Sequence, residues 1–305
     1  MSWLRKLLNN PLKPGAVLMR KLGPWIKDDE TYLRWYYFFS MRKRLNLKTP
    51  STFNEKVNWL KLHDHNPLYT SLVDKLEAKD YVTKKVGAGH VFPTLGIWHR
   101  PEDIEWDALP SRFVLKTTQG GGGIGVIICH DKTKFDKAKA IAKLNSALKQ
   151  NLYTSSREWP YRDVRPRIFA EPYMEDEHGE LRDYKFFCFG GKVKALFIAE
   201  DRQGDEETKF DFFDADFHHL DIRNGHPNAS VPPEKPLSFE KMKEMAERLS
   251  QGIPHLRVDF YEANGKIYFG ELTFSHWSGF TPFEPAEWDL RFGQWLELPS
   301  KQKTT

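Results

Sequence analysis

The sequence predicts an α+β chain, in which a helical N-terminal part precedes antiparallel strands and two further helices. Residues 28–85 carry apolar side chains at helical spacing, whereas from residue 112 onward short β-type runs are separated by glycines and turns. Asn264 and Gly265, a pair typical of a tight hairpin turn, separate the last two runs. Regular alternation of strands with helices is missing, which argues against a Rossmann fold.

Three helices carry local signals. Thr52 and Glu55 have the spacing of a capping box, which predicts that a helix begins after Thr52. Apolar side chains recur at helical spacing over residues 135–148 and again over residues 239–249. Ser238 directly precedes the second of these segments, so we expect its hydroxyl to cap that helix.

The predicted strands are short apolar or alternating runs bounded by turn residues. They cover residues 112–117, 124–129, 167–173, 184–189, 193–199, 209–213, 256–261 and 266–272. The first two flank a run of glycines, and the last two form the two arms of a hairpin.

Bulk composition excludes several classes of protein. The 305 residues are 40% hydrophobic and 29% charged, as in ordinary globular proteins. Subtracting 42 acidic from 46 basic residues leaves a net charge of +4, too small to indicate nucleic acid as the partner. No apolar run reaches the roughly 18 residues of a membrane span. Cys129 and Cys188 lie in separate apolar runs, which predicts buried, reduced thiols and a cytoplasmic protein.

Residues 1–27 form a basic segment with interleaved apolar side chains and no acidic residue. Its basic residues are Arg5, Lys6, Lys13, Arg20, Lys21 and Lys27. Pro11 and Pro14 interrupt any apolar stretch, so a cleaved signal peptide is not expected. Two interpretations remain open. The segment is either a peripheral contact with anionic lipid at the inner face of the membrane, or a short helix packed on the domain.

A run of four glycines at residues 120–123 lies between two predicted strands. Four consecutive glycines lose much conformational entropy on folding, so their bare backbone must serve a purpose. Successive free N–H groups in such a loop can surround an anion, and Lys116 ends the strand that enters it. A Walker loop is excluded because no Gly-Lys-Ser/Thr follows. We expect phosphate binding here, with a flexible hairpin turn as the alternative.

The C-terminal hairpin brings acidic residues together. Arg257 and Asp259 are two apart on one arm, and Glu271 and Thr273 are two apart on the other, so each pair shares a face. Two carboxylates placed side by side repel unless a cation lies between them. Mg²⁺ suits such a site because it takes a few carboxylate oxygens and leaves positions for phosphates and water. The alternative is an Arg257–Glu271 ion pair at a solvated edge.

In order along the chain, these motifs resemble the active site of the ATP-grasp superfamily. The matching residues are Lys116, the glycine loop, Glu171-Pro-Tyr-Met174, Asp183-Tyr-Lys185, Arg257-Val-Asp259 and Glu271-Leu-Thr273. More narrowly, Phe53-Asn-Glu-Lys56, Val73-Asp-Lys75, Asp183-Tyr-Lys-Phe186 and Gly270-Glu-Leu-Thr-Phe274 resemble the TupA-like branch, named for teichuronopeptide biosynthesis. The resemblance runs from about residue 30 to the end of the chain, and only the basic N-terminal segment lies outside it.

The resemblance implies specific roles for these residues. The implied ATP-binding residues are Lys75, Lys116, Gly120, Gly121, Gly122, Gly123, Glu171, Tyr173, Asp183 and Lys185, with Lys79 as an alternative to Lys75. The glycines form the mobile loop over the triphosphate, and the segment from Glu171 forms the hinge that recognises adenosine. Asp259, Glu271 and Thr273 are the implied magnesium ligands, and Arg257 and Lys185 the catalytic residues. Many relatives carry Asn in place of Thr273.

By the same resemblance, the fold consists of two α+β lobes that grip ATP. The expected divisions are residues 1–27, a helical region at 28–110 and ATP-grasp lobes at 111–305, divided near residue 172. The implied activity is ATP-dependent amide formation through an acyl phosphate, with ATP and Mg²⁺ as cofactors. The TupA-like branch is associated with cell-surface polysaccharide assembly. Its members therefore suggest an amino acid as one substrate and a uronic acid of a glycan, or a sugar precursor, as the other.

Substrate-binding residues are expected in the less family-like stretches. Ser275, His276 and Trp277 follow the metal arm directly and would face a sugar, although His276 is equally a loop histidine without chemistry. Four arginines surround Trp159 and Tyr161, and would bind an anionic glycan or form a solvated face. They are Arg157, Arg162, Arg165 and Arg167.

Other functions remain open at this point. Asp214 and Asp216 form an Asp-x-Asp, as in glycosyltransferases that bind a nucleotide sugar through a metal, but aspartates also favour hairpin turns. A sugar or small-molecule kinase would share the same ATP site. A non-catalytic scaffold held at the membrane by residues 1–27 would not need the lysines and carboxylates together.

Overall fold

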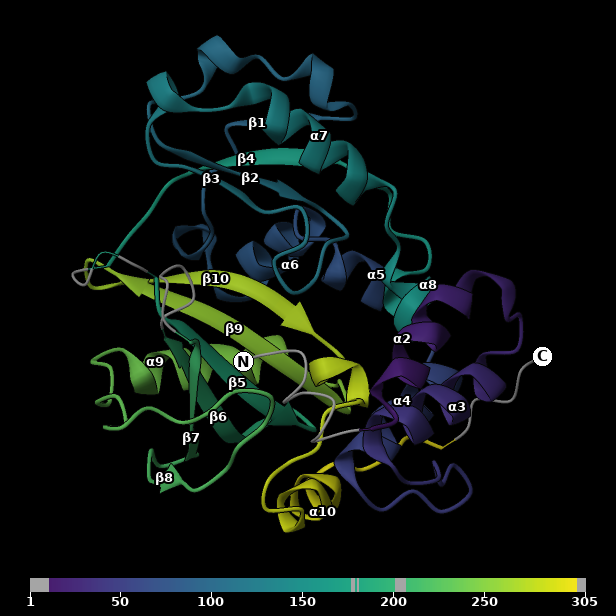
Figure 1. The fold of residues 1–305 in the computed structure, drawn as a ribbon. Coiled ribbons are helices and arrows are strands. Elements are labelled where there is room, and N and C mark those ends of the chain that lie inside the picture. Colours follow the sequence, from purple (N-terminus) through teal and green to yellow (C-terminus); the bar gives the residue numbers. More distant parts are fainter. Residues whose placement is uncertain (1–10, 177–178, 180, 201–206, 301–305) are drawn as a thin grey trace.

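A computed structural model describes residues 11–300 apart from 177–178, 180 and 201–206. In Figure 1, N-terminal helices lie beside two antiparallel sheets, and the smaller sheet lies above the larger one. The predicted α+β class is confirmed. Helices pack on one face of the smaller sheet and, in part, on both faces of the larger one.

The N-terminal region is helical, as predicted from its spacing. Its helices are α2 (Lys13–Leu22), α3 (Asp29–Met41), α4 (Phe53–His63), α5 (Leu68–Val73) and α6 (Glu77–Val86). Asp28 caps α3 by accepting from the N–H of Thr31 at 2.7 Å. The Thr52–Glu55 capping box is confirmed, with each side chain bonded to the backbone of the other. Short 3₁₀ turns lie at Gly23–Trp25, Ala88–His90, Pro101–Asp103, Trp106–Ala108, Lys132–Lys134, Trp159–Tyr161 and His276–Gly279.

Helix α2 packs on the domain, in agreement with one of the two interpretations of the basic segment. Met19 is buried in a core cluster with side chains of α3. Gly15 lies so close to Phe39 of α3 that an added Cβ would be 2.4 Å from its ring. Leu18 and Trp25 nevertheless remain 54% and 74% exposed. Residues 1–10 of the segment, with Arg5 and Lys6, lie outside the described residues.

The smaller sheet has the strand order β1-β4-β2-β3, all antiparallel. Its strands are β1 (Gly96–Trp98), β2 (Phe113–Thr117), β3 (Ile127–Cys129) and β4 (Ile168–Pro172). Helix α7 (Lys137–Leu148) covers one face, where Phe113, Leu115 and Leu144 are buried. The edge strand β1 comes from the range that was expected to be helical.

The larger sheet has the order β10-β9-β5-β6-β7-β8, also antiparallel. Its strands are β5 (Asp183–Phe189), β6 (Lys192–Glu200), β7 (Lys209–Asp214), β8 (His219–Leu220), β9 (His255–Ala263) and β10 (Lys266–Thr273). Helix α9 (Phe239–Leu249) packs on one face, as predicted from its spacing. Helices α4 and α10 (Glu287–Trp295) cover part of the other face. A short helix, α8 (Leu152–Ser156), leads from α7 towards β4.

Two local predictions are corrected. The run 124–129 forms a strand only from Ile127, because Gly123 and Gly125 adopt positive φ angles of 81° and 74° and extend the loop. Ser238 occupies the N-cap position of α9 but its hydroxyl donates to Glu262 at 2.5 Å and caps nothing.

Predictions about cysteines and membrane spans are also settled for the described residues. Cys129 and Cys188 are both buried and free, as expected. Burial raises the pKa of the Cys188 thiol to about 12, so it remains protonated and unreactive. Among the helices of the described residues, none has the length and apolar character needed to cross a membrane.

Candidate active site

Three neighbouring strands, β10, β9 and β5, place charged side chains on one face of the larger sheet. Because side chains alternate along a strand, Arg257 and Asp259 point away from the core that their neighbours fill. Strand pairing sets Lys185 opposite Asp259 on one side and Glu271 opposite Asp259 on the other. The sheet register therefore forms one row in which an acid, Asp259, lies between a base, Lys185, and a second acid, Glu271.

A β-bulge at Gly270 turns Glu271 towards this row. From the hairpin turn outward, β9 and β10 pair residue by residue as far as Phe269, and the next pair is Glu271 with Asp259, so Gly270 is the extra residue. If the regular pairing continued without a bulge, Gly270 would lie opposite Asp259 and Glu271 opposite Val258. The Glu271 side chain would then enter the core. A Cβ added at Gly270 would lie 3.1 Å from the Asp259 carbonyl oxygen, a tight contact that glycine avoids.

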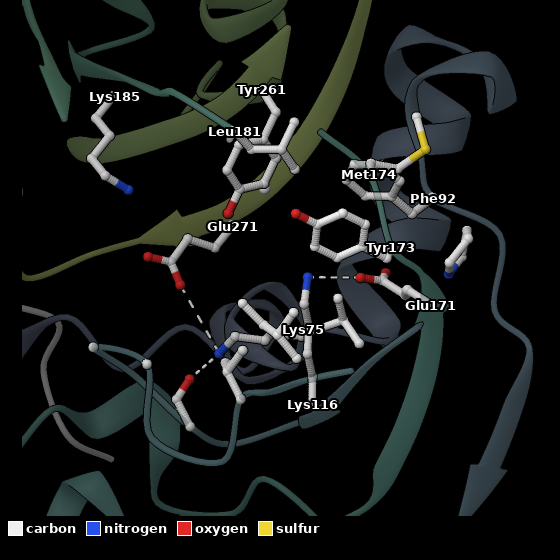
Figure 2. A pocket seen from close by; sticks show the side chains of 18 residues that line it. Lys75, Phe92, Lys116, Glu171, Tyr173, Met174, Leu181, Lys185, Tyr261 and Glu271 are labelled. Atoms are coloured by element: carbon white, nitrogen blue, oxygen red, sulfur yellow. Dashed lines mark hydrogen bonds and ion pairs between the residues drawn. The ribbon is translucent and has the colours of Figure 1, made fainter. Parts of the chain in front are cut away.

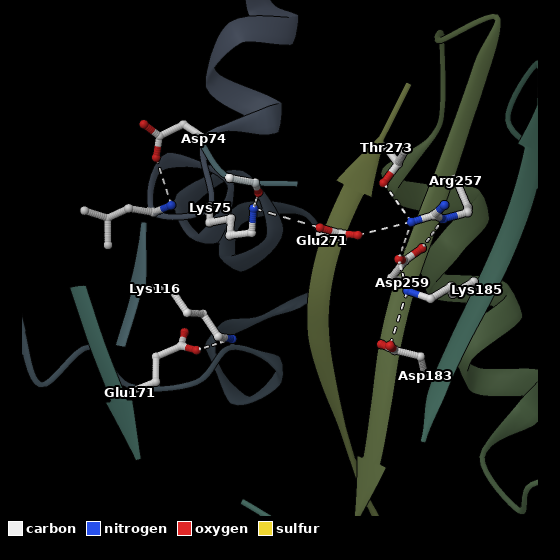
Figure 3. A network of polar contacts seen from close by, with 12 residues as sticks. Asp74, Lys75, Lys116, Glu171, Asp183, Lys185, Arg257, Asp259, Glu271 and Thr273 are labelled. Carbon is white, nitrogen blue, oxygen red and sulfur yellow. Dashed lines mark hydrogen bonds and ion pairs between the residues drawn. The ribbon is translucent and has the colours of Figure 1, made fainter. Parts of the chain in front are cut away.

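Arg257 lies at the centre of a buried ion network (Figure 3). Its guanidinium donates to both carboxylate oxygens of Asp259 at 2.7 Å, to Glu271 at 3.1 Å and to the Thr273 hydroxyl at 3.0 Å. The Lys185 ammonium lies 2.5 Å from Asp259. The Arg257 and Asp259 side chains are only 8% and 1% exposed. The Arg257–Glu271 ion pair therefore exists, but its expected position at a solvated edge was wrong.

Burial and neighbouring charges fix the protonation states of this network. Burial opposes ionisation of Asp259, but Arg257 and then Lys185 outweigh that effect and hold the pKa of the carboxyl well below its usual range. Burial lowers the pKa of Lys185, against the opposing effect of Asp259. For Arg257, burial is outweighed by Asp259, and its pKa is raised. Asp259 is thus an anion and Arg257 a cation at neutral pH.

A second charged group faces the network from the smaller sheet. Glu171, on β4, is buried and forms ion pairs with Lys116 of β2 at 2.7 Å and with Lys79 of α6 at 2.5 Å. Burial raises the pKa of Glu171, but Lys116 and then Lys79 outweigh it and lower the value overall. The Glu171 side chain therefore fixes the positions of the Lys116 and Lys79 ammonium groups.

Lys75 connects the two halves of the site. It follows α5, its ammonium donates to the carbonyl of Gly120 in the glycine loop, and it lies 4.0 Å from a carboxylate oxygen of Glu271 (Figures 2 and 3). Burial lowers the pKa of Lys75. Lys75 therefore contacts both the loop and the carboxylate row.

A cavity of about 330 Å³ lies between these groups, within the size range of small-molecule sites. Figure 2 shows Lys75, Lys116 and Glu271 around the space that Tyr173 and Tyr261 also border. Its apolar lining comes from Phe92, Val114, Val126, Ile128, Pro172, Met174 and Leu181. The cavity thus combines an apolar surface for a flat ring with several cations for phosphates. Asp183, another expected ATP ligand, is buried 3.4 Å from the Lys185 ammonium and is not part of this lining.

The glycines of the loop are needed for two different reasons. A Cβ at Gly122 or Gly123 would meet nothing within 4 Å, but both residues have positive φ angles, 58° and 81°, and line the cavity. At Gly120 an added Cβ would lie 2.2 Å from the Ile124 carbonyl, and at Gly125 it would lie 2.1 Å from the Thr117 hydroxyl. Gly120 and Gly125 therefore shape the loop, while Gly122 and Gly123 present open backbone to the cavity.

A second cavity of about 540 Å³ adjoins the first, and both are lined by Gly122, Lys185 and Glu271. Arg257 and Thr273 line only the second of the two. Its other lining residues include the three predicted after the metal arm and a basic residue of α2: Ser275, His276, Trp277 and Arg20. The sequence motifs thus meet at one place, where two cavities share a wall.

His276 positions Arg257. Its ring is only 2% exposed, Nδ1 accepts from Arg257 at 2.8 Å, and Nε2 lies 2.8 Å from the Asn224 side-chain oxygen. Burial, and then Arg257, hold the pKa of His276 well below its usual value, so the ring is neutral and can accept. His276 is thus a buried residue whose contact orients a charged group of the site, and its predicted role in binding a sugar stays a prediction.

The wall of the second cavity contains a strained turn. Trp277 and Ser278 both have left-handed backbone angles, with φ of 48° and 53°, which cost roughly 1–2 kcal/mol per residue. Buried Lys61 stabilises this turn by donating to the Ser278 carbonyl at 2.6 Å and to the Ser156 carbonyl at 2.8 Å. Burial lowers the pKa of Lys61 to about 7. The turn holds Trp277 at the cavity, where it is 40% exposed.

Glu158 is an acidic residue of the second cavity that the sequence analysis did not identify. It is 5% exposed, and one of its oxygens accepts from the hydroxyls of Ser278 at 2.6 Å and Ser156 at 3.0 Å. The cavity therefore contains a carboxylate as well as the cations Arg257 and Lys185.

The four arginines near Trp159 are not one surface. Arg157 is buried and donates to the carbonyls of Gly23 and Ile26, which anchors the end of α2. Arg167 pairs with Asp74 at 2.8 Å. Arg162 and Arg165 are exposed, and neither is among the described residues that line the two cavities.

The Asp-x-Asp segment forms a turn. Asp214, at the end of β7, accepts from the N–H groups of Asp216 and His218 at 2.9 Å, and its other oxygen lies 2.9 Å from the His218 ring. These contacts occupy both oxygens of Asp214 with local bonds, as expected for a hairpin turn. Neither aspartate is among the described residues that line the two cavities.

The sequence matches the TupA-like ATP-grasp family over residues 55–297. The chain belongs to this family. Members of the ATP-grasp ligase family use ATP with Mg²⁺ and typically form C–N bonds. The α+β architecture with two antiparallel sheets is that of ATP-grasp ligases. No curated protein matches the sequence at a significant level.

Solved structures resemble this TupA-like ATP-grasp protein at low sequence identity. A D-alanine–D-alanine ligase from Bacillus anthracis is 18% identical over 73% of this chain, with a TM-score of 0.41. A D-alanine–D-alanine ligase from Helicobacter pylori is 15% identical over 74%, with a TM-score of 0.41. D-Cycloserine synthetase DcsG is 16% identical over 75% of this chain and 71% of its own, with a TM-score of 0.42. This chain spans 60% and 61% of the two D-alanine–D-alanine ligases.

The donor set of this TupA-like ATP-grasp protein fits magnesium. Mg²⁺ prefers oxygen ligands and binds through one or two carboxylates together with phosphate oxygens and water. Glu271 is 29% exposed and lines both cavities, and Thr273 lines the second, whereas Asp259 is buried with its oxygens bonded to Arg257 and Lys185. Within the described ranges, no group of three or more His, Cys, Asp or Glu side chains is placed to hold a metal. A magnesium ion here would therefore depend on the nucleotide for further ligands.

Proposed function

We propose that this chain is an ATP-dependent carboxylate–amine ligase, which joins an amino acid to a uronic acid of a cell-surface polysaccharide or its precursor. The observation that carries the proposal is the shared wall between the two cavities. A ligase of this kind needs a nucleotide site directly beside a site for two further substrates, so that a phosphoryl group passes between them. Lys185, Glu271 and Gly122 line both cavities and thus border the point of transfer.

The proposed reaction has two steps. A carboxylate oxygen of the acceptor attacks the γ-phosphorus of ATP, and the bond from that phosphorus to ADP breaks. The nitrogen of the amine then attacks the acyl carbon, the bond to phosphate breaks, and the nitrogen loses a proton. Arg257 and Lys185 stabilise the negative charge on the transferred group and on the tetrahedral intermediate. Magnesium, when bound, neutralises part of the phosphate charge.

The second cavity has the charges that this pair of substrates requires. Arg257 and Lys185 are cations suited to the carboxylate, and Glu158 is an anion suited to the ammonium of an amino acid. The hydroxyls of Ser156 and Ser278 fix the Glu158 carboxylate in place. Trp277 offers an exposed ring against which a sugar can lie.

An acyl phosphate is destroyed by water, so the site must close during the reaction. The glycine loop is the proposed lid, because Gly122 and Gly123 line the nucleotide cavity without side chains. Lys75 contacts the loop and lies near Glu271, and this would link closure to occupancy of the site. ATP supply and the reduced cysteines are consistent with action in the cytoplasm.

Phosphate release from MgATP would test the function directly, across a panel of amino acids and uronic acids. We expect ADP and phosphate only when both substrates are present, with an amide in the product by mass spectrometry. A stable phosphorylated sugar formed without the amine would identify a kinase instead. Consumption of a UDP-sugar without ATP would identify a glycosyltransferase, and ATP binding without turnover on any pair would identify a scaffold.

Glu158→Gln provides the matched test of the amine site. It removes the negative charge at nearly constant volume and keeps a group that can accept from Ser156 and Ser278. We expect the KM for the amino acid to rise roughly tenfold, because a charge-assisted bond is replaced by a neutral one, while the KM for ATP stays the same. Equal KM values for the amine in both proteins would contradict this role of Glu158.

Two alanine substitutions separate the two kinds of glycine in the loop. Gly123→Ala meets no neighbouring atom but strains a residue at φ 81°, so we expect weaker ATP binding and a small loss of stability, roughly 1–2 kcal/mol. Gly125→Ala adds a clash with Thr117 to similar strain, so its melting temperature should fall further. Differential scanning fluorimetry with and without MgATP measures both effects. Indistinguishable stability in the two variants would show that the loop rearranges freely.

A further inference from the structure

A basic groove extends the second cavity away from the reaction site. It has a volume of about 470 Å³ and lies between α2, the glycine loop and the connection from α7 to α8. Its charged lining residues are Arg20 and Lys21 of α2 and Lys149, which follows α7. Among the described residues that line it, none is aspartate or glutamate. The groove therefore has charge of one sign only.

Nothing in the described part of the chain neutralises these cations. Arg20, Lys21 and Lys149 are exposed, and within residues 11–300, apart from 177–178, 180 and 201–206, none of them forms an ion pair with a carboxylate. A concave surface lined by charges of one sign focuses the electric field and attracts counter-ions. The groove is thus suited to an anionic ligand.

Gln119, at the base of the groove, favours a hydroxyl group, whereas the three cations favour an anion. It is 4% exposed and its amide nitrogen donates to the Ala147 carbonyl at 3.2 Å. In the described structure its amide oxygen has no hydrogen-bond partner. A buried amide oxygen accepts hydrogen bonds but cannot donate them, so it favours a hydroxyl over a phosphate or carboxylate oxygen. A ligand with both carboxylates and hydroxyls matches this groove better than a phosphate-rich one.

The groove continues directly from the second cavity. Arg20, Gly121 and Ile124 line both spaces, together with Leu152 and Ser155. A chain whose end lies beside Arg257 therefore has a path under α2 into the groove. Helix α2 lies before residue 55, where the match to the TupA-like family begins, so this wall lies outside the matched range.

We propose that the groove binds the sugar residues next to the one that is modified, and that the acceptor is an anionic oligosaccharide or polymer and not a single sugar. This inference rests on the proposed ligase function and specifies its acceptor. Arg20, Lys21 and Lys149 bind carboxylates of neighbouring uronic acids, and Gln119 accepts from a hydroxyl. The reactive carboxylate lies beyond them in the second cavity, next to Arg257.

The test compares the affinities of galacturonic acid monomer, dimer and hexamer for the full-length protein by calorimetry. In wild type we expect affinity to increase with chain length. The Lys21→Glu/Lys149→Glu variant should lose roughly tenfold in affinity for the hexamer and nothing for the monomer, since each exposed ion contact contributes up to about fivefold. The control is Lys13→Glu/Lys27→Glu, an equal change of charge at two positions of the N-terminal region outside the groove.

Several results would overturn the proposal. Equal affinity for monomer and hexamer in wild type would exclude an extended acceptor site, and an equal loss in the control variant would assign the effect to net charge. Binding to vesicles of phosphatidylglycerol and phosphatidylcholine tests the alternative that the groove contacts anionic lipid. If the groove variant loses vesicle binding but keeps hexamer binding, the groove contacts membrane. Calorimetry measures binding without turnover. If affinity still increases with the length of the oligosaccharide but the protein shows no ligase activity, the proposed ligase function is wrong and the proposed binding in the groove stands.

Discussion

Glu271→Gln is expected to lower the rate of amide formation roughly 10²–10³-fold, the typical loss when one group that stabilises a transition state is removed. Glu271 lines both cavities and offers a carboxylate oxygen towards the nucleotide side. Glutamine keeps the shape and can still accept from Arg257, but it lacks the charge that a magnesium ion requires. The loss should therefore appear in kcat and in the magnesium concentration needed for half-maximal rate.

The fold should tolerate this change, because the Glu271 side chain is 29% exposed. We expect the melting temperature of Glu271→Gln to stay close to that of wild type. Glu287→Gln is the matched control, since Glu287 is exposed in the first turn of α10 and touches neither cavity. Full ATP-dependent amide formation by Glu271→Gln would contradict the assignment of the active site to this row of strands.

The hairpin at the C-terminus shows how far the sequence could predict the site. Asn264 and Gly265 both adopt positive φ angles, 53° and 68°, so the turn and the two arms were predictable from local chemistry. The alignment of Glu271 with Asp259 was not, because it depends on the bulge at Gly270. A bulge shifts register by one residue, and its signal is one glycine within an apolar strand.

Residues that act through tertiary contacts were also beyond prediction. Val114, on β2, pairs with Ile128 on one side and Glu171 on the other, so the three share the face that lines the cavity. Alternation along β2 indicated that Val114 and Lys116 share a face, but it did not say which face would be buried under α7. His276 and Glu158 come from loops whose positions only the fold determines. No local pattern distinguishes them from ordinary loop residues.

The basic N-terminal segment illustrates the limit of composition. Its amphipathic pattern fitted both a membrane contact and a packed helix, because either surroundings can bury one apolar face. Met19 and Gly15 decide the packing of α2, since both lie against side chains of α3. Met19 is apolar, but so are Leu18 and Trp25, which remain exposed, so composition alone does not identify the buried side. The sequence does show that the segment is basic, and the structure places one of its basic residues, Arg20, at the second cavity.

Asp259→Asn is expected to destabilise the folded protein by about 3–5 kcal/mol, the usual cost of removing one partner from a buried ion pair. Asp259 is fully buried and is bonded to both Arg257 and Lys185. Asparagine can accept from one of them, but both buried cations lose their nearest carboxylate, and Arg257 is left with Glu271 at 3.1 Å and Lys185 with Asp183 at 3.4 Å. Urea unfolding would show the effect as a lower midpoint with an unchanged slope.

A second variant distinguishes two causes of lower stability, the loss of the ion pairs of Asp259 and a general disruption of the fold. Lys185→Met removes one of the two cations that Asp259 neutralises, so Asp259→Asn/Lys185→Met should be more stable than Asp259→Asn alone. If the double variant is no more stable, the ion pair is not the source of the loss. Equal urea midpoints for wild type and Asp259→Asn would likewise contradict the argument.

The dependence of stability on pH provides an independent check on Asp259. Its pKa in the folded state lies below the value of about 3.9 that an unfolded aspartate has. The stabilisation from this carboxylate is therefore complete above about pH 4 and is lost as the pH falls towards the lower folded-state pKa. Wild type should lose this contribution on acidification, and Asp259→Asn should not, so the difference in free energy of unfolding between them should narrow below pH 4. A difference that stays constant down to the lowest pH at which both proteins fold would show that Asp259 stabilises the structure by its shape and hydrogen bonds and not by its charge.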